Sequence, residues 1–529
     1  MDYTTHFFIC QAFFKKYSVI FFVIFPILFR VMNLSGRTTD YKNTYLSGNL
    51  QTDIALFKEI FKKDCILRVK NIIAREGESF DCAVIYFDGM VDSEQVNDAV
   101  IEPLLTVTTK NESGSLTEYI EKQVLFARDV KKSKTVAQIL EGILYGEVAI
   151  LIQGSTTALN VDAKGFRTRG ITEPVDERVL QGPREGFEEA ALLNLAMLRR
   201  KLQTPDLCNE VMRVGRRSNT LVFICYLDSL ADKKTLEEVK KRIKKIDIVG
   251  ILDSNYLTEF IRDSRYSPFK TTGTTERPDT VAARLLEGRI AVIVDGTPMV
   301  LTVPYLFSEN FQSDEDYYLN FSVATVGRML RYICFFLSIS IPAIFISLLN
   351  FHTELLPTTL RIAISELRGG VPFSPFSECI ILIFIFEILR EAGVRMQQSL
   401  GHTLSIVGGL VVGQAAVDAG IISTPMLIVI ALSGISGLMI PRLRGAVFYL
   451  KVALVLVSWF LGLYGFILGI TFMIMHIISL TSFGVDYTVT LRRADFQSLK
   501  DTLWRAPWNK MRLRPDFNKN IIRNKGINK

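Results

Sequence analysis

One apolar stretch divides the chain into two parts: Leu330-Arg-Tyr-Ile-Cys-Phe-Phe-Leu-Ser-Ile-Ser-Ile-Pro-Ala-Ile-Phe-Ile-Ser-Leu-Leu-Asn-Phe351. It is long enough to cross a bilayer as a helix, since a transmembrane helix needs about 20 apolar residues. Charged residues are dense before this stretch, from Asp40 to Asp316, and sparse from Leu330 to Ser482. This distribution predicts a soluble domain followed by a membrane domain.

Further apolar segments follow within the membrane part. Ile422 to Ile440 is long enough to span, whereas Cys379 to Leu389 and Thr403 to Val417 become long enough only with their flanks. Val447 to Leu480 is too long for one comfortable crossing. Either a tight hairpin near Gly465 and Gly469 divides it, which gives six crossings, or one long tilted helix gives five.

The basic residues indicate the topology. Residues 492–529 contain eleven Lys and Arg against three Asp and Glu, so the positive-inside rule predicts a cytoplasmic tail. Six crossings place this tail, the other basic flanks and the soluble domain on one side of the membrane. We therefore expect a multi-pass membrane protein with both termini on the cytoplasmic side. The other basic flanks are Arg390, Arg395, Arg442, Arg444 and Lys451.

The soluble half repeats a pattern of strands and helices. Asp81 to Asp92 and Leu221 to Asp232 each predict a buried strand, a turn and a helix, at an offset of 140 residues (221 minus 81). Leu144 to Gly154 and Leu286 to Gly296 each predict a helix end, a glycine cap and a hairpin, at an offset of 142 (286 minus 144). Two matches at nearly the same spacing predict a duplication, in which each lobe is strand, helix, helix and hairpin.

The predicted fold is an α/β soluble domain of two similar lobes, followed by a C-terminal all-α polytopic membrane domain. The N-terminal segment is apolar from Tyr17 to Phe29, which is short for a span and lacks the order of a signal peptide. A dispensable extension before a start at Met32, an interfacial anchor and a genuine span all remain open. The expected boundaries are 1–44 for the extension, 45–180 for the first lobe, 181–320 for a linker helix and the second lobe, 321–485 for five to six membrane helices, and 486–529 for the basic cytoplasmic tail.

A helix is predicted between the lobes, from Pro183 to Leu202. Acidic residues near its start and basic residues near its end complement the helix dipole. One interpretation is an amphipathic linker that packs between the lobes. The other is a contact with a second subunit, made by charges at both ends of the helix. The candidate contact residues are Arg184, Glu185, Glu188, Arg199 and Arg200.

Two groups of residues in the membrane part are not explained by contact with lipid alone. Charges at membrane depth are costly and face protein or water, so the charged group is either a set of local ion pairs at a helix end or part of an ion pathway or gate. The small residues allow helices to approach closely and can also line a pore. The candidate pore or gate residues are Glu378, Glu387, Arg390, Glu391, Arg395 and Asp418, and the candidate packing or pore-lining residues are Gly409, Gly413, Gln414 and Gly420.

Several function classes lack support in the sequence. It contains no phosphate-binding loop, dinucleotide fingerprint or nucleophile elbow. The aspartates that follow the strands are explained as turn and helix caps. Seven scattered cysteines and four histidines predict neither a zinc site nor another metal centre. A net charge of +7 is modest for 529 residues and does not suggest nucleic acid. We expect a protein that is not an enzyme and has no cofactor.

Several long motifs resemble the A subunit of the GerA-type spore germinant receptor family. The resemblance covers about residues 45–515, in order. In the soluble half it is carried by Gly182-Pro-Arg-Glu-Gly-Phe-Glu-Glu, Lys244-Lys-Ile-Asp-Ile-Val-Gly-Ile-Leu-Asp-Ser254, Thr275-Glu-Arg-Pro-Asp279 and Leu286-Glu-Gly-Arg-Ile-Ala-Val-Ile-Val-Asp-Gly-Thr-Pro298. In the membrane half it is carried by Phe351-His-Thr-Glu-Leu-Leu-Pro357, Gly370-Val-Pro-Phe373, Glu387-Ile-Leu-Arg-Glu-Ala-Gly-Val-Arg395, Gly413-Gln-Ala-Ala-Val417 and Ser482-Phe-Gly484.

The resemblance implies a location and partners. It implies a protein of the spore inner membrane that works with a transporter-like B subunit and a lipoprotein C subunit. It further implies a homo-oligomer, a pentamer, whose membrane helices form a gated ion channel that responds to nutrients and releases monovalent cations. The sequence departs from the family at Met396-Gln397, at Asp486 and at Pro441-Arg-Leu-Arg-Gly445. A stage V sporulation paralogue that acts as an accessory channel, and a non-conducting membrane scaffold, are the alternatives.

Overall fold

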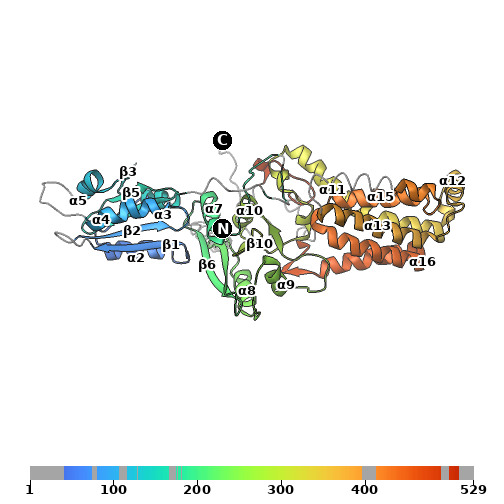
Figure 1. The fold of residues 1–529 in the computed structure, drawn as a ribbon, viewed down its shortest axis with the longest axis horizontal. Coiled ribbons are helices and arrows are strands. Elements are labelled where there is room, and N and C mark those ends of the chain that lie inside the picture. Colours follow the sequence, from blue (N-terminus) through green and yellow to red (C-terminus); the bar gives the residue numbers. More distant parts are fainter. Residues whose placement is uncertain are drawn as a thin grey trace, which may run out of the picture. The chain divides into compact units, whose positions relative to one another are not determined.

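The computed structural model describes residues 41–73, 80–106, 116–127, 129–165, 174, 177–179, 181–395, 413–489 and 500–511. It divides into two compact units, which are described separately (Figure 1). The α/β unit consists of Met1–Arg178, Arg184–Leu257 and Thr274–Thr302. The helical unit consists of Val179–Pro183, Thr258–Gly273 and Val303–Lys529.

The α/β unit contains two five-stranded sheets with the same strand order, which confirms the predicted duplication. The order β1-β2-β4-β5-β3 in the first lobe becomes β6-β7-β9-β10-β8 in the second, strand for strand. The first sheet comprises β1 (Leu67–Ile73), β2 (Asp81–Phe87), β3 (Val130–Ser133), β4 (Glu147–Ile152) and β5 (Ala158–Asp162). The second comprises β6 (Leu207–Val214), β7 (Thr220–Leu227), β8 (Gly273–Thr275), β9 (Ile290–Val294) and β10 (Val300–Val303).

Helices accompany both sheets, and the central strands are apolar on both faces. β4 and β9 are buried along their whole length, as their Val- and Ile-rich sequences require. The helices of the first lobe are α2 (Leu50–Ile60), α3 (Ser93–Val96), α4 (Glu102–Thr106), α5 (Leu116–Tyr119) and α6 (Val136–Leu144), with π-helical turns at Asn97–Ile101 and Ile120–Val124. Those of the second lobe are α7 (Ala191–Lys201), α8 (Lys233–Lys244), α9 (Ser254–Ile261) and α10 (Pro278–Leu286).

The duplication extends to the first helix of each lobe. The N–H of Leu50, which opens α2, donates to Oε1 of Gln153 at 2.8 Å. The N–H of Ala191, which opens α7, donates to Oδ1 of Asp295 at 3.0 Å. In each lobe a side chain that follows the fourth strand thus binds the first N–H of this helix, where intrahelical partners are missing. Helix α7 is therefore the counterpart of α2 rather than an added connector.

The predicted start of this helix near Pro183 is wrong, because α7 begins at Ala191. The preceding loop uses its backbone in other contacts. The N–H of Phe187 donates to the carbonyl of Glu276 at 2.7 Å. The side chain of Asn194 donates to the carbonyl of Glu188 at 2.6 Å and accepts from the N–H of Glu188 at 2.8 Å. These bonds replace the helical pattern that the acidic residues suggested.

The helical unit is a bundle in which α11, α13, α15 and α16 run side by side, with α12 at one end (Figure 1). Among the residues that the structure describes, two helices, Phe321–Asn350 and Pro441–Ser479, are long and apolar enough to cross a membrane. The helices are α11 (Phe321–Asn350), α12 (Thr358–Arg368), α13 (Pro375–Arg395), α15 (Thr424–Leu438) and α16 (Arg444–Ser479). The short elements are η4 (Phe307–Phe311), η5 (Asp314–Tyr317), η6 (Thr353–Leu355), η7 (Pro441–Leu443), β11 (Thr481–Ser482), β12 (Val485–Asp486) and η8 (Trp508–Lys510).

Helix α16 is a hairpin of two helical arms. Gly462 has φ 61° and ψ −145°, a conformation that favours glycine. A Cβ built on Gly469 lies 2.6 Å from Cδ2 of Leu454, fifteen residues earlier in the chain. In a straight helix these residues would be roughly 22 Å apart. The chain therefore reverses at Gly462, three residues before the predicted Gly465. The number of membrane crossings stays a prediction.

Candidate functional site in the helical unit

The carboxylate of Glu378, in the first turn of α13, is completely buried. Nη1 of Arg368, at the end of α12, donates to it at 3.1 Å. The N–H and the hydroxyl of Ser423, which precedes α15, donate to its other oxygen at 2.6 and 2.5 Å. A buried carboxylate is tolerated only when a cation and hydrogen bonds compensate its lost hydration. Glu378 thus connects the ends of three helices through one charge.

The other end of α13 contains a chain of ion pairs. Glu387 pairs with Arg390 one turn later, which is the local ion pair that the spacing predicts. Glu391 pairs with Arg395 at 2.8 Å and with Arg444 of α16 at 2.7 Å. Arg444 also lies 3.9 Å from Glu387, so it links α16 to both carboxylates. A role of these residues in a pore or gate stays a prediction.

The remaining candidates lie in or beside the segment before α15. Asp418 and Gln414 are exposed. A Cβ on Gly413 would lie 3.6 Å from Leu427, which is an ordinary packing distance. Gly420 has φ 66°, so its role is to end the helical segment in a left-handed conformation. Gly409 lies outside the described residues.

Closer packing occurs on α15, which the sequence reasoning did not single out. A Cβ on Gly434 would lie 2.4 Å from the ring of Phe386 on α13, so only glycine fits there without a shift. A Cβ on Gly437 would lie 3.0 Å from Oγ of Ser338 on α11. The pattern Ser433-Gly-Ile-Ser-Gly437 is a small-xxx-small motif and would have indicated this close approach.

These close contacts border a cavity of about 10 Å³ between four helices. Lys451 of α16 lines it and is only 8% exposed, although its position suggested a basic flank at the membrane surface. Sequence position alone does not show which face of a helix is turned inward, so the burial of this lysine was missed. The polar lining of the cavity is formed by Ser338, Glu387, Arg390 and Lys451.

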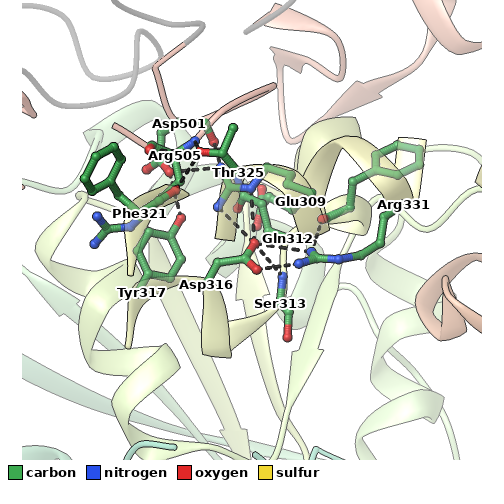
Figure 2. Close-up of polar contacts among 12 residues, drawn as sticks. Glu309, Gln312, Ser313, Asp316, Tyr317, Phe321, Thr325, Arg331, Asp501 and Arg505 are labelled. Carbon is green, nitrogen blue, oxygen red and sulfur yellow. Dashed lines mark hydrogen bonds and ion pairs between the residues drawn. The ribbon is translucent and has the colours of Figure 1, made fainter. Parts of the chain in front are cut away.

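A second charged cluster lies at the start of α11 and holds part of the C-terminal segment (Figure 2). Arg328 is completely buried; its Nε donates to Asp316 of η5 at 3.1 Å, and its Nη1 donates to the carbonyl of Asp501 at 2.6 Å. Arg331 forms a further ion pair with Asp316. Two arginines therefore compensate one buried carboxylate, and Arg328 also binds Asp501 at the start of α11.

Further hydrogen bonds extend this attachment of the C-terminal segment. The hydroxyl of Tyr317 donates to Asp501 at 3.1 Å, and the N–H of Arg505 donates to the hydroxyl of Thr325 at 3.2 Å. Figure 2 shows these side chains converging from η5, α11 and the C-terminal segment. Sequence reasoning treated this segment only as a basic tail. No local pattern identifies partners that are over 170 residues apart.

The predicted subunit-contact residues of the α/β unit are engaged to different degrees. Arg199 is buried and pairs with Asp64 of the first lobe. Glu185 pairs with Arg200 and, at 2.9 Å, with Lys201. Burial alone would raise the pKa of Glu185, but hydrogen bonds and charge from Lys201 and Arg200 outweigh it and lower that pKa. Arg184 is exposed and Glu188 half-buried, and their contact with another subunit stays a prediction.

Within the described ranges, no three His, Cys, Asp or Glu side chains are grouped so that they could hold a metal ion. The arrangement offers buried charges and a small polar cavity. Chemically, it is suited to binding or moving ions and to coupling the positions of helices.

One protein-family model and several curated proteins match most of the length of this chain. The family model described as Bacillus/Clostridium GerA spore germination protein matches residues 55–517. Spore germination protein KA of Bacillus subtilis (strain 168) is 39% identical over 473 residues, which are 89% of this chain and 87% of that protein. Uncharacterized membrane protein YfkQ of the same organism is 38% identical over 436 residues, 82% of this chain and 84% of that protein.

A protein of another species and a solved structure are also similar to this chain. Spore germination protein GerLA of Bacillus cereus is 32% identical over 447 residues, 84% of this chain and 91% of that protein. The crystal structure of the N-terminal domain of the A subunit of the Bacillus megaterium spore germinant receptor GerK3 is 32% identical. It covers 50% of this chain and 98% of its own length, with a TM-score of 0.40. From the family match and the full-length relatives, the chain belongs to the GerA family of spore germination proteins, as a member of the A-subunit type.

Proposed function

We propose that this protein is the A subunit of a spore germinant receptor and forms a gated ion channel. In this proposal it assembles as a homo-oligomer, a pentamer, in the spore inner membrane. It spans that membrane several times with both termini on the cytoplasmic side. A transporter-like B subunit and a lipoprotein C subunit complete the receptor, and nutrients trigger release of monovalent cations through the A subunits. Membership of a family of spore germination proteins supports the role in germination.

The observation that carries the channel proposal is the buried carboxylate of Glu378 among apolar helices. An anchor or scaffold needs only apolar helices. A charge at membrane depth is costly, so its presence suggests a function beyond anchoring. Here one carboxylate depends on Arg368 of α12 and on Ser423 at the start of α15. Any relative movement of these helix ends breaks its bonds, so Glu378 suits an element with two arrangements.

The magnitude of this interaction is sufficient for a gate. Breaking one partner of a buried ion pair costs about 3–5 kcal/mol. Since each 1.4 kcal/mol corresponds to about tenfold in an equilibrium constant, loss of these bonds shifts a closed–open equilibrium by about a hundredfold or more. In our proposal these bonds stabilise the resting arrangement.

Exposed apolar side chains on the same helix support assembly. Ile381, Phe384 and Ile388 of α13 are 38%, 49% and 66% exposed in the single chain. Such a row needs lipid or a neighbouring subunit to cover it. A ring of subunits would bring α13 of each copy, with its charges, toward a shared axis.

The experiment measures potassium release from spores that carry this protein and its partners as their only germinant receptor. We expect the substitution Glu378→Gln, which removes the charge and keeps the size, to cause potassium loss without nutrients. Glu366→Gln, on the exposed face of α12, makes the same chemical change and serves as the matched control. If Glu378→Gln protein is present at normal levels and release with and without nutrients is unchanged, the gating role is wrong and the scaffold alternative gains support.

A further inference from the structure

We propose that Lys451, Arg390 and Ser338 form a binding site for one small monovalent anion of the halide class inside the helical unit. This inference does not depend on the proposed channel function. It concerns the cavity of about 10 Å³ that lies where α11, α13, α15 and α16 meet. Gly434 and Gly437 of α15 also line this cavity, and Phe386 and Ser338 pack closely against them.

Three hydrogen-bond donors around this cavity lack an acceptor. Oγ of Ser338 and Nε of Arg390 are buried and have no hydrogen-bond partner. Lys451 is 8% exposed, and its ammonium group forms no ion pair or hydrogen bond with any residue that the structure describes. Buried donors without a partner cost about 1–3 kcal/mol each, and more when charged. Ser338 and Arg390 each bring one such buried donor to this space, and Lys451 also lines it, so the three side chains together indicate a missing acceptor.

The charge of the lining distinguishes an anion from a water molecule. Arg390 and Lys451 bring two positive charges to the cavity, and Glu387 brings one negative charge that Arg390 already pairs with. The lining therefore carries one net positive charge in an apolar bundle, where such a charge is strongly disfavoured. A water molecule would satisfy a donor but not this charge. A monovalent anion satisfies both, and a cation would add to the imbalance.

The size of the cavity limits the anion. The centre of a water-sized sphere can occupy about 10 Å³ of this cavity, so the space accepts one sphere somewhat larger than water. This volume excludes a phosphate, a lipid headgroup and an organic carboxylate, and leaves a monoatomic anion such as chloride or bromide. The residues that hold it would come from three helices, α11, α13 and α16, so the bound anion would stabilise their packing.

The test uses the full-length purified protein and bromide as the probe. Chloride is first replaced by gluconate, and sodium bromide is then titrated at constant ionic strength. Bound bromide is measured by equilibrium dialysis, and the Tm is followed in parallel, since a ligand that binds only the folded state raises it. We expect saturable binding of one bromide per chain and a Tm that rises with its concentration.

Matched variants locate the site. Lys451→Met removes the net positive charge and is expected to weaken bromide binding about tenfold or more. Lys510→Met makes the same change at an exposed position and is expected to leave binding unchanged. Ser338→Ala keeps all charges and removes one donor, so it is expected to weaken binding severalfold even if Lys451→Met does not fold.

The outcomes that overturn the proposal are distinct. One is the absence of saturable bromide binding by the wild-type protein, which would mean that the cavity holds only water. Another is saturable binding that both Lys451→Met and Ser338→Ala leave unchanged, which would place the anion elsewhere.

Discussion

Arg199 of α7 and Asp64 of the first lobe form an ion pair in which the side chains are only 0% and 2% exposed. Nη1 and Nη2 of Arg199 also donate to the carbonyls of Thr204 and Leu207, at 2.7 and 2.9 Å. Its guanidinium group lies 4.6 Å from the ring centre of Phe87 in the first lobe. The helix that repeats α2 in the second lobe therefore also fixes that lobe to the first.

Loss of this arginine should destabilise the α/β unit. Arg199→Met leaves the carboxylate of Asp64 buried without a cation, with hydrogen bonds from Asn209 at 3.3 Å and from the N–H of Ile66 at 3.2 Å. This costs about 3–5 kcal/mol of the free energy of unfolding. Limited proteolysis of the full-length protein checks this. Cleavage near residue 64 is expected at lower denaturant concentrations in the variant than in the wild-type protein. Arg200→Met, which breaks only a partly exposed pair with Glu185, should cost about 1 kcal/mol or less. Equal protease resistance of both variants would contradict the role of the buried pair.

The hairpin in α16 predicts a glycine requirement at one position. Gly462→Ala would place a Cβ 3.1–3.2 Å from Phe351 and His352, at a φ of 61° that L-residues rarely adopt. We expect a loss of about 1–3 kcal/mol in stability, seen as a lower Tm of the purified protein. The control is Gly445→Ala in the first turn of α16, where a Cβ meets open space. It should leave the Tm unchanged or raise it, since alanine favours helices.

The same hairpin predicts the side of the membrane on which residue 461 lies. Leu461, at the tip, is half exposed, so a cysteine placed there should react with a membrane-impermeant thiol reagent from outside the cell membrane. A cysteine at exposed Lys510 should react only after the membrane is opened. In a single long tilted helix, residue 461 would lie within the bilayer. Protection of Leu461→Cys from both sides would therefore contradict the hairpin.

The cluster around Asp316 predicts that the C-terminal segment detaches when Arg328 is removed. Trp504 and Trp508 lie in this segment, and with Trp459→Phe they become the only tryptophans of the chain. In that background Arg328→Met removes the bonds to Asp501, so tryptophan emission should shift to longer wavelength as the indoles enter water. Arg361→Met on the exposed side of α12 is the control and should show no shift. An unchanged spectrum with Arg328→Met would mean that other contacts hold the segment.

The repeat in the α/β unit could be predicted because its central strands are apolar and keep a nearly constant offset. The outer strands were missed for a physical reason. β1 and β6 lie at sheet edges and contain polar residues such as Lys70 and Glu210, and β3 has only four residues. Edge strands need to bury fewer side chains, so their sequences carry a weaker pattern.

The candidate site was only partly predictable. The pairing of Glu387 with Arg390 follows from helical spacing, which is a local property. The partners of Glu378 and Asp316 come from other helical elements, and Lys451 lines a cavity between four helices. Both arrangements depend on how the bundle packs. The start of α7 was misplaced because acidic residues near Pro183 suit a helix start, whereas Glu185 instead pairs with basic residues at the far end of that helix. Tertiary contacts outweighed local propensity in each of these cases.

The gated channel is tested most directly by the ion conductance of the purified receptor in a planar lipid bilayer. The protein is reconstituted together with its B and C partners, and current is recorded before and after nutrients are added. We expect discrete cation-selective currents that nutrients increase, and that flow without nutrients in Glu378→Gln but not in Glu366→Gln. Absence of any current from a correctly assembled complex, in the presence of a nutrient that germinates the corresponding spores, would contradict it.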